Sequence, residues 1–178
     1  MSASVEPWTD LGEDRVGYDG FIKVVVRRLR MPDGTEVEWD LLDTPASVAV
    51  FALTDDDQVV LVEQFRPGPG RVVRSLPGGI IDPGEGPEEA AARELLEETG
   101  YSARELEVLS AIEPVNATRP WWAVLARGAT RTASQSLDDY EDIGVVLQPV
   151  DEVRRAARDG QIGSLVQIYL ALDRLGRL

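Results

Sequence analysis

A loop dense in glycine and proline, residues 76–86, runs directly into a segment whose two ends both carry helix signals. Gly86 is suited to the N-cap, Pro87 to the first helical position, and Gly100 to the left-handed residue that stops a helix. Glutamates follow the proline at once and suit the positive end of the helix dipole. The sequence therefore predicts a helix over residues 88–99 that leaves the loop at a fixed point.

The glutamates of this helix gather on one face. At 100° per residue, Glu97 and Glu98 fall within about 60° of Glu94, one on each side. The opposite half is expected to pack inward and consists of Ala91, Ala92, Leu95 and Leu96. Arg93 can pair with Glu97 four residues on, but one guanidinium does not neutralise three carboxylates. A divalent cation would neutralise them, and an ordinary solvated acidic face is the alternative interpretation.

The absence of two residue types narrows the chemistry. The chain has no cysteine and no histidine, which excludes thiolate nucleophiles, imidazole bases and Cys- or His-ligated metals. Acid–base chemistry then falls to Asp, Glu, Lys or Tyr, and a metal site would offer oxygen ligands, which favour Mg²⁺, Mn²⁺ or Ca²⁺. A net charge of −14 argues against nucleic acid and anionic membrane surfaces as partners, because both need cations opposite them.

The spacing of the loop and helix residues matches a known pattern. The pattern G-x5-E-x7-R-E-U-x-E-E-x-G-U, in which U is a bulky apolar residue, is met at every fixed position by Gly79, Glu85, Arg93, Glu94, Leu95, Glu97, Glu98, Gly100 and Tyr101. This segment resembles the Nudix box of the Nudix hydrolases. Residues 59–66, 76–79 and 137–143 extend the resemblance to ADP-ribose pyrophosphatases and related nucleoside-diphosphate-sugar hydrolases, so that it covers residues 20–176.

The resemblance implies an α/β fold, a Nudix-type α/β/α sandwich with a mixed sheet and an N-terminal β-hairpin extension. Strands and helices that alternate without a regular βαβ rhythm also favour a mixed sheet. The residue patterns predict strands over 21–31, 35–42, 46–53, 58–65, 72–76, 106–112, 121–126 and 143–149, and helices over 88–99, 151–158 and 164–175. The chain is expected to divide into a lead-in and hairpin over 1–42, loose and polar up to residue 17, and a Nudix hydrolase domain over 43–178.

The resemblance also implies a reaction and a metal site. Members of the family hydrolyse a nucleoside diphosphate linked to another moiety, here ADP-ribose or another nucleotide sugar, to a nucleoside monophosphate and a sugar phosphate. The implied ligands of Mg²⁺ or Mn²⁺ are Glu94, Glu97, Glu98 and the carbonyl of Gly78. Arg93 is expected to orient the glutamates, and Glu85 to brace the loop. The bound ion would neutralise the diphosphate and activate the attacking water.

The resemblance to the ADP-ribose branch implies that the general base lies outside the box, in the acidic loop 138–142. Glu141 is the first choice, because a glutamate reaches farther, and Asp139 is the second. Glu97, within the box, is the competing candidate, and an ordinary polar turn is the alternative for the loop. The resemblance also implies that Arg66 and Gly79 bind the substrate, with a plain surface charge as the alternative for Arg66.

Two departures from this branch leave the substrate open. Relatives commonly carry an acid two residues before the proline of the loop entry, where this chain has Ser75. They also carry an acid in the segment after the next proline, whereas residues 115–122 hold a cation and two tryptophans instead. A nucleotide sugar other than ADP-ribose is therefore credible. Trp121 or Trp122 could stack on a base, and because adjacent strand residues point to opposite faces, one of them is expected in the core.

Functions of other classes are weighed against this one. A house-cleaning nucleoside triphosphate pyrophosphohydrolase would use the same fold, but the late acidic stretch and the N-terminal hairpin favour the nucleotide-sugar hydrolase. A non-catalytic nucleotide-sugar-binding Nudix sensor would be expected to have a degraded box and a basic extension. A simple Ca²⁺-binding protein is disfavoured because the chain lacks the D-x-[DN]-x-[DN]-G loop.

The expected partners are a small-molecule nucleotide-sugar substrate and a second copy of the chain. Relatives in this branch are usually homodimers whose N-terminal strands reach the partner's site, and the hairpin 20–42, with Phe21 and Trp39, is placed to do so. A hairpin packed on its own subunit is the alternative. The N-terminus lacks the apolar stretch of a signal peptide, and no apolar run approaches the ~20 residues of a membrane span. A cytoplasmic protein with no membrane partner is therefore expected.

Overall fold

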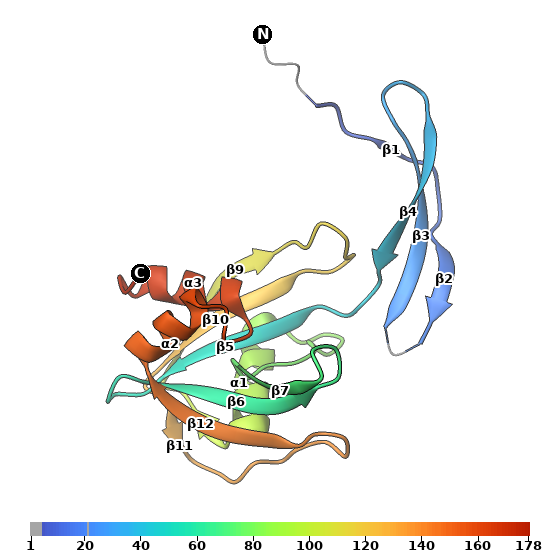
Figure 1. Ribbon diagram of the computed structural model, residues 1–178. Coiled ribbons are helices and arrows are strands. Elements are labelled where there is room, and N and C mark those ends of the chain that lie inside the picture. The colour runs from blue at the N-terminus through green and yellow to red at the C-terminus, as the bar shows by residue number, and fades with distance from the viewer. Residues whose placement is uncertain (1–4, 21) are drawn as a thin grey trace. The chain divides into compact units, whose positions relative to one another are not determined.

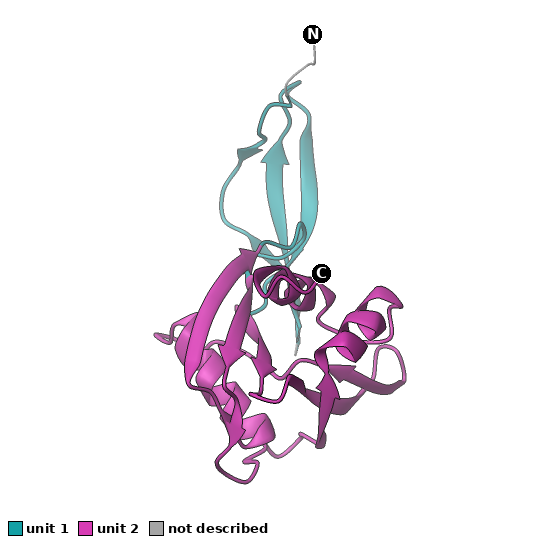
Figure 2. Cartoon of the chain, turned by 90° about the vertical axis from the view of Figure 1, so that its left-hand side faces the viewer, with its two compact units in different colours: residues 1–45, 113–120 teal, residues 46–112, 121–178 magenta. Residues whose placement is uncertain are grey.

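The computed structural model describes residues 5–20 and 22–178, and the chain forms two compact units (Figure 2). One unit contains the chain up to Pro45 together with residues 113–120, and the other contains residues 46–112 and 121–178. Each unit has its own main sheet, and the three helices that the structure describes all belong to the second unit. The loop and helix that carry the matched pattern, residues 76–101, lie wholly within this second unit as well.

The first unit is an antiparallel sheet of four strands, which are β1 (Thr9–Asp10), β2 (Arg15–Asp19), β3 (Lys23–Arg30) and β4 (Glu36–Leu42). β3 and β4 form the expected hairpin, in register from Val24 opposite Leu42 to Arg30 opposite Glu36. The prediction of a loose lead-in is wrong for β1 and β2, which both pair with β3. Their side chains are exposed, so these strands form through backbone pairing and lack the apolar run that marks a buried strand. Phe21 lies outside the described residues.

The second unit is built on a six-stranded sheet (Figure 1). Its strands are β5 (Ser47–Leu53), β6 (Gln58–Arg66), β7 (Arg71–Ser75), β9 (Glu105–Ile112), β10 (Trp121–Arg127) and β12 (Ile143–Pro149). They follow the order β12, β6, β5, β10, β9, and β7 also pairs with β6. β5 and β10 are parallel and the other pairs are antiparallel, so the sheet is mixed, as predicted. The short strands β8 (Tyr101–Ser102) and β11 (Thr130–Arg131) form a separate ribbon.

Helices cover both faces of this sheet (Figure 1). They are α1 (Pro87–Thr99), α2 (Val150–Arg158) and α3 (Leu165–Arg174). Successive strand residues point to opposite faces, so Val50 joins the apolar cluster under Leu95 of α1, whereas Phe51 joins the cluster under Ile168 of α3. The continuous apolar runs of the central strands follow from burial on both faces. The predicted α/β/α sandwich is confirmed.

The predicted strands and helices of this second unit match the observed ones to within one residue at each end. The exceptions are β8 and β11, two residues each, which the sequence does not mark. Among the described residues, no helix has the length and apolar character needed to cross a membrane.

Candidate active site

The loop before α1 is pressed against β5. The N–H of Val48 donates a hydrogen bond to the carbonyl of Gly79, and the N–H of Val50 donates to that of Pro77, each at 2.9 Å. Gly78, between them, has a φ of +150°. A Cβ at Gly78 would collide with the carbonyl oxygen of Val48. Close backbone approach therefore requires glycine here.

α1 begins and ends at the predicted residues. Gly86 is the N-cap, Pro87 opens the helix, and Gly100 ends it with a φ of +73°. The Glu89 carboxylate accepts a hydrogen bond from the N–H of Gly86 at 2.9 Å, which closes the first turn. Gly100 also admits the chain that packs against the helix end, because a Cβ there would collide with the carbonyl oxygen of Ala133.

Two of the three glutamates on the acidic face of α1 are covered by other residues. Glu94 and Glu98 are only 9% and 5% exposed. Ala92 and Leu96, which the helical wheel assigns to the inward face, are exposed instead, so that assignment is wrong for these two residues. Glu94 and Glu98 are buried because the preceding loop folds back over this part of the helix. Gly79 lies so close to Glu94 that a Cβ there would strike the carboxylate.

Arg93 joins this loop to the helix, and all five of its N–H groups donate hydrogen bonds. Two go to the carboxylate of Glu85, at 3.0 and 2.9 Å. The others go to Glu94 at 2.8 Å, to Glu97 at 3.1 Å and to the carbonyl of Ile80 at 2.9 Å. The guanidinium holds the pKa of Glu85 below its usual range. Arg93 thus contacts two of the three glutamates while it fastens the loop.

Glu98 is the most buried carboxylate of the helix. Its side chain accepts one hydrogen bond among the described residues, from the N–H of Gly78 at 2.7 Å. Burial, together with the nearby charges of Glu94 and Glu141, raises the pKa of Glu98 to about 8. Burial also raises the pKa of Glu94, against the opposing effect of Arg93. Two buried carboxylates this close are unfavourable unless they are protonated or neutralised by a cation.

These residues fit a hard divalent cation, because carboxylate and carbonyl oxygens are the ligands that Mg²⁺ takes in proteins. Glu94 and Glu98 both lie against the Gly78–Gly79 backbone. In the described part of the chain no three acidic side chains are already arranged around one point, since Glu97 turns to Arg93 and its side chain is 44% exposed. The predicted set therefore divides into a buried pair and an exposed third member.

The acidic loop before β12 brings one of its carboxylates toward this pair. Glu141 is half-buried, and its charge raises the pKa of both Glu94 and Glu98. Its carboxylate accepts a hydrogen bond from the N–H of Asp138 at 3.1 Å, and its own N–H donates to the Asp138 carbonyl at 3.0 Å. Asp139 is exposed. Of the two predicted candidates, Glu141 is the half-buried one and the one whose charge acts on the buried glutamates.

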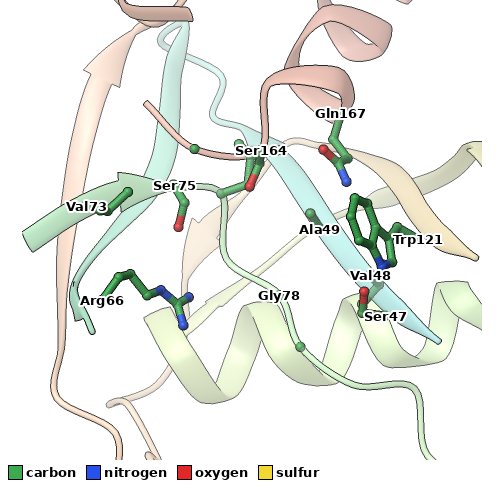
Figure 3. Close-up of a pocket in the computed structure, with 13 residues that line it drawn as sticks. Ser47, Val48, Ala49, Arg66, Val73, Ser75, Gly78, Trp121, Ser164 and Gln167 are labelled. Carbon is green, nitrogen blue, oxygen red and sulfur yellow. The ribbon is translucent and has the colours of Figure 1, made fainter. Parts of the chain in front are cut away.

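A pocket of about 320 Å³ adjoins this cluster (Figure 3). Arg66, at the end of β6, reaches into one end of the pocket, beside Ser75 at the end of β7. Gly78 lines the pocket too, and its N–H connects the pocket to Glu98. The charge of Arg66 partly opposes the rise in the pKa of Glu98. At the other end stand Trp121 and residues of α3. None of the described residues that line the pocket is acidic.

The adjacent tryptophans lie on opposite faces of β10, as predicted. Trp122 packs against the cluster under α1, whereas Trp121 is 42% exposed and faces the pocket, opposite Ser47 in the parallel pair (Figure 3). Sequence reasoning missed two other lining residues, Ser164 and Gln167, at the start of α3. No local pattern marks them, because their place depends on where the last helix returns to the sheet.

Comparison with known proteins identifies relatives of this chain. The profile of the NUDIX domain matches residues 43–166. The ADP-ribose pyrophosphatase of Bacillus subtilis (strain 168) is 38% identical over 101 residues, which cover 57% of this chain and 55% of that protein. The ADP-ribose pyrophosphatase of Mycobacterium tuberculosis (strain ATCC 25618 / H37Rv) is 30% identical over 145 residues, which cover 79% and 70%. The methanol dehydrogenase activator of Bacillus methanolicus is 29% identical over 148 residues, which cover 79% and 78%.

A solved structure, of an ADP compounds hydrolase, has the same fold. The two chains superpose with a TM-score of 0.79 at 22% sequence identity, over 99% of this chain and 100% of the other. At this level of identity the likeness concerns the fold alone. The match to the Bacillus subtilis protein spans little more than half of that protein, at 55% of its length.

Proposed function

The chain belongs to the NUDIX domain family, and on that premise we propose that it is a divalent-metal-dependent pyrophosphohydrolase. It hydrolyses the pyrophosphate bond of a nucleoside diphosphate linked to another moiety and releases a nucleoside monophosphate and a sugar phosphate. The observation that carries this proposal is the buried pair Glu94 and Glu98 against Gly78, in a chain of net charge −14. A protein this acidic repels a pyrophosphate unless a cation stands between them.

Each residue of the cluster has a role in this proposal. Glu94, Glu98 and the carbonyl of Gly78 hold Mg²⁺ or Mn²⁺, and Glu97 holds a further ion or bridges to it through water. When bound, such an ion neutralises the diphosphate, polarises a P–O bond and lowers the pKa of bound water. Arg93 keeps the glutamates in place through its hydrogen bonds to them.

The lining of the pocket favours a substrate with an uncharged group beside the diphosphate, as in a nucleotide sugar. Arg66 is suited to contact the diphosphate, and Gly79 leaves room for it. Trp121 offers an exposed ring for stacking, and the side chains of Ser164 and Gln167 offer hydrogen bonds to hydroxyl groups or to a base (Figure 3). A triphosphate would bring more negative charge to a pocket with one cationic residue in its described lining. ADP-ribose is the first substrate to test, because two relatives are ADP-ribose pyrophosphatases.

The decisive experiment is a substrate panel assayed with Mg²⁺ for release of phosphate monoesters. It contains ADP-ribose, UDP-glucose, GDP-mannose, ATP and dGTP. We expect at least one nucleotide sugar to be hydrolysed with a kcat/KM at least about 10-fold above that of either triphosphate, a margin that pocket contacts can supply. Hydrolysis of the triphosphates alone would refute the substrate and support the house-cleaning alternative. Binding of a nucleotide sugar without any hydrolysis would support the sensor.

Glu141→Gln is expected to lower kcat by roughly 10²- to 10³-fold, the usual contribution of a general base. The Mg²⁺ concentration that gives half-maximal activity should change little. A metal-bound carboxylate is a poor proton acceptor, whereas Glu141 lies near the proposed ligands without being one of them. The measurement is kcat as a function of Mg²⁺ concentration. Asp139→Asn, in the same loop but exposed, is the matched control and should stay within about twofold of the wild type.

Two variants in the helix separate the base from the ligands. Glu94→Gln should weaken Mg²⁺ binding, because it removes a buried ligand charge. Glu97→Gln tests the competing assignment of the base to the box. If Glu141→Gln turns over normally while Glu97→Gln is inactive with unchanged Mg²⁺ affinity, the base lies in the helix and its assignment to the loop is wrong.

We also expect a homodimer in which the first unit takes part. The sheet of this unit carries exposed apolar side chains: Val16 and Tyr18 on β2 are 50% and 63% exposed. Trp39 on β4 is 48% exposed and packs edge-to-face on Trp8, with ring centroids 5.8 Å apart.

Light scattering at micromolar concentration should give twice the chain mass of 19.5 kDa. The double variant Val16→Glu/Tyr18→Glu should be monomeric, whereas the control Leu147→Glu, on β12, should not. A monomeric wild type would contradict this prediction.

A further inference from the structure

One amide side chain connects the box helix to the loop that carries Glu141. The Nε2 atom of Gln135 donates one hydrogen bond to the carbonyl of Glu98 at 2.7 Å and another to the carbonyl of Ile143 at 2.9 Å. Both hydrogens of the amide are thereby used. Glu98 is the most buried carboxylate of α1, and Ile143 is the first residue of β12, two residues after Glu141.

The backbone around Gln135 is fixed to the same end of the helix. The N–H of Ser136 donates to the carbonyl of Glu97 at 2.9 Å. The N–H groups of Thr132 and Ala133 both donate to the carbonyl of Gly100, at 2.8 and 3.1 Å. These bonds satisfy carbonyls that a helix end otherwise leaves without partners. The backbone of Gln135 is therefore fixed to the helix end, and its side chain links that end to Ile143, where the loop ends.

The loop between these fixed points, residues 136–142, contains a turn held by hydrogen bonds between two of its own residues. Asp138 and Glu141 exchange two hydrogen bonds, one between backbone groups and one from the Asp138 N–H to the Glu141 carboxylate. The turn from 138 to 141 is thus one small unit. Of the described side chains, Gln135 is the one that joins both the box helix and the residue where this loop ends. Its contacts set the distance between the turn and the buried glutamates.

We infer that Gln135 is a positioning residue for the reaction, because it holds Glu141 at a fixed distance from Glu94 and Glu98. This inference rests on the proposed function, in which Glu141 accepts a proton from the attacking water. A base that drifts by about 1 Å loses much of its effect on the rate, since proton transfer needs hydrogen-bond contact with the water. In this inference Gln135 acts on the reaction only through Glu141, because its amide hydrogens are bonded to the two backbone carbonyls.

The test replaces Gln135 with methionine, which has similar length but no N–H donor. We expect Gln135→Met to lower kcat by roughly 10- to 100-fold, with KM and the half-maximal Mg²⁺ concentration within about threefold of the wild type. Hydrogen exchange of the amides in 136–142 should become faster in the absence of any substrate. Gln58→Met is the matched control, because Gln58 is also half-buried and donates to a backbone carbonyl, in the turn between β5 and β6. Gln58→Met should change neither kcat nor the hydrogen exchange of the amides in 136–142.

A double variant distinguishes positioning from simple support of the fold. If Gln135 acts through Glu141, then Gln135→Met should lower kcat by less than about twofold further when Glu141 is already glutamine. An equal loss of kcat in both backgrounds would overturn the inference and leave Gln135 as a helix cap. Unchanged exchange in 136–142 would overturn it too, whether or not the protein has the proposed activity. Should Gln135→Met fail to fold, Gln135→Asn, whose shorter amide cannot span both carbonyls, carries the same test.

Discussion

Removal of divalent cations is expected to abolish hydrolysis completely. With excess EDTA, the rate on the best nucleotide-sugar substrate should fall by more than about 10³-fold, the scale of metal catalysis of such reactions. Mg²⁺ or Mn²⁺ added above the chelator should restore it. The physical reason is electrostatic: the site presents Glu94 and Glu98 to an anionic substrate, in a chain with 32 acidic and 18 basic residues. Turnover at the wild-type rate in metal-free buffer would contradict the proposed mechanism.

A readout that does not depend on activity should accompany this assay. A ligand that binds only the folded protein raises its stability by mass action. Mg²⁺ should therefore raise the melting temperature of the wild type, and Glu94→Gln or Glu98→Gln should reduce that increase. Glu88→Gln is the control, because Glu88 lies on the same helix but is exposed in its first turn. An equal increase in all four proteins would place the ion elsewhere.

Much of the fold could be predicted because its signals are local. The ends of α1 depend on a glycine–proline start at Gly86 and a glycine stop at Gly100, and both act through the backbone of the residue itself. The central strands are continuous apolar runs because helices cover both faces. β2 could not be found in this way, because its five exposed residues include no apolar run and its existence depends on pairing with β3.

The candidate site, too, could be predicted where it depends on neighbouring residues and could not where it depends on residues far apart in the chain. The spacing of Glu94, Glu97 and Glu98 places three carboxylates on one side of a helix. It does not show that the loop folds back to cover Glu94 and Glu98 while Ala92 faces solvent. That outcome depends on the contact of the loop with β5. Gln167 was missed for the same reason, since it lies 26 residues after Glu141, the last site residue that the sequence marks, and meets the pocket only through the fold.

Glu98→Gln is expected to lower kcat by about 10³-fold or more with little change in structure. The substitution keeps the volume of the side chain and an oxygen that can accept the hydrogen bond from Gly78. It removes one of the two buried charges available to hold the ion, so transition-state stabilisation of several kcal/mol is expected to be lost. Steady-state kinetics at saturating Mg²⁺, with circular dichroism to check the fold, measures this. Activity within threefold of the wild type would refute the assignment of Glu98 as a ligand.

The same substitution should stabilise the metal-free protein, because burial of this carboxylate is unfavourable when no cation is bound. Burial raises the pKa of Glu98 to about 8 in the folded chain, whereas a glutamate in an unfolded chain titrates near pH ~4.3. The folded protein therefore binds a proton at Glu98 more tightly than the unfolded chain does. This tighter binding contributes stability to the folded state that is fully present below pH ~4.3 and is lost as the pH rises through 8.

In EDTA at alkaline pH, Glu98→Gln should therefore melt about 2 to 6 °C above the wild type. The difference should shrink at pH ~5, where the wild-type carboxyl is protonated. Saturating Mg²⁺ should reverse the order, because only the wild type keeps the full set of ligands. If the variant melts below the wild type in EDTA at alkaline pH, the buried charge of Glu98 is compensated within the protein, and the electrostatic need for a cation at this site is removed.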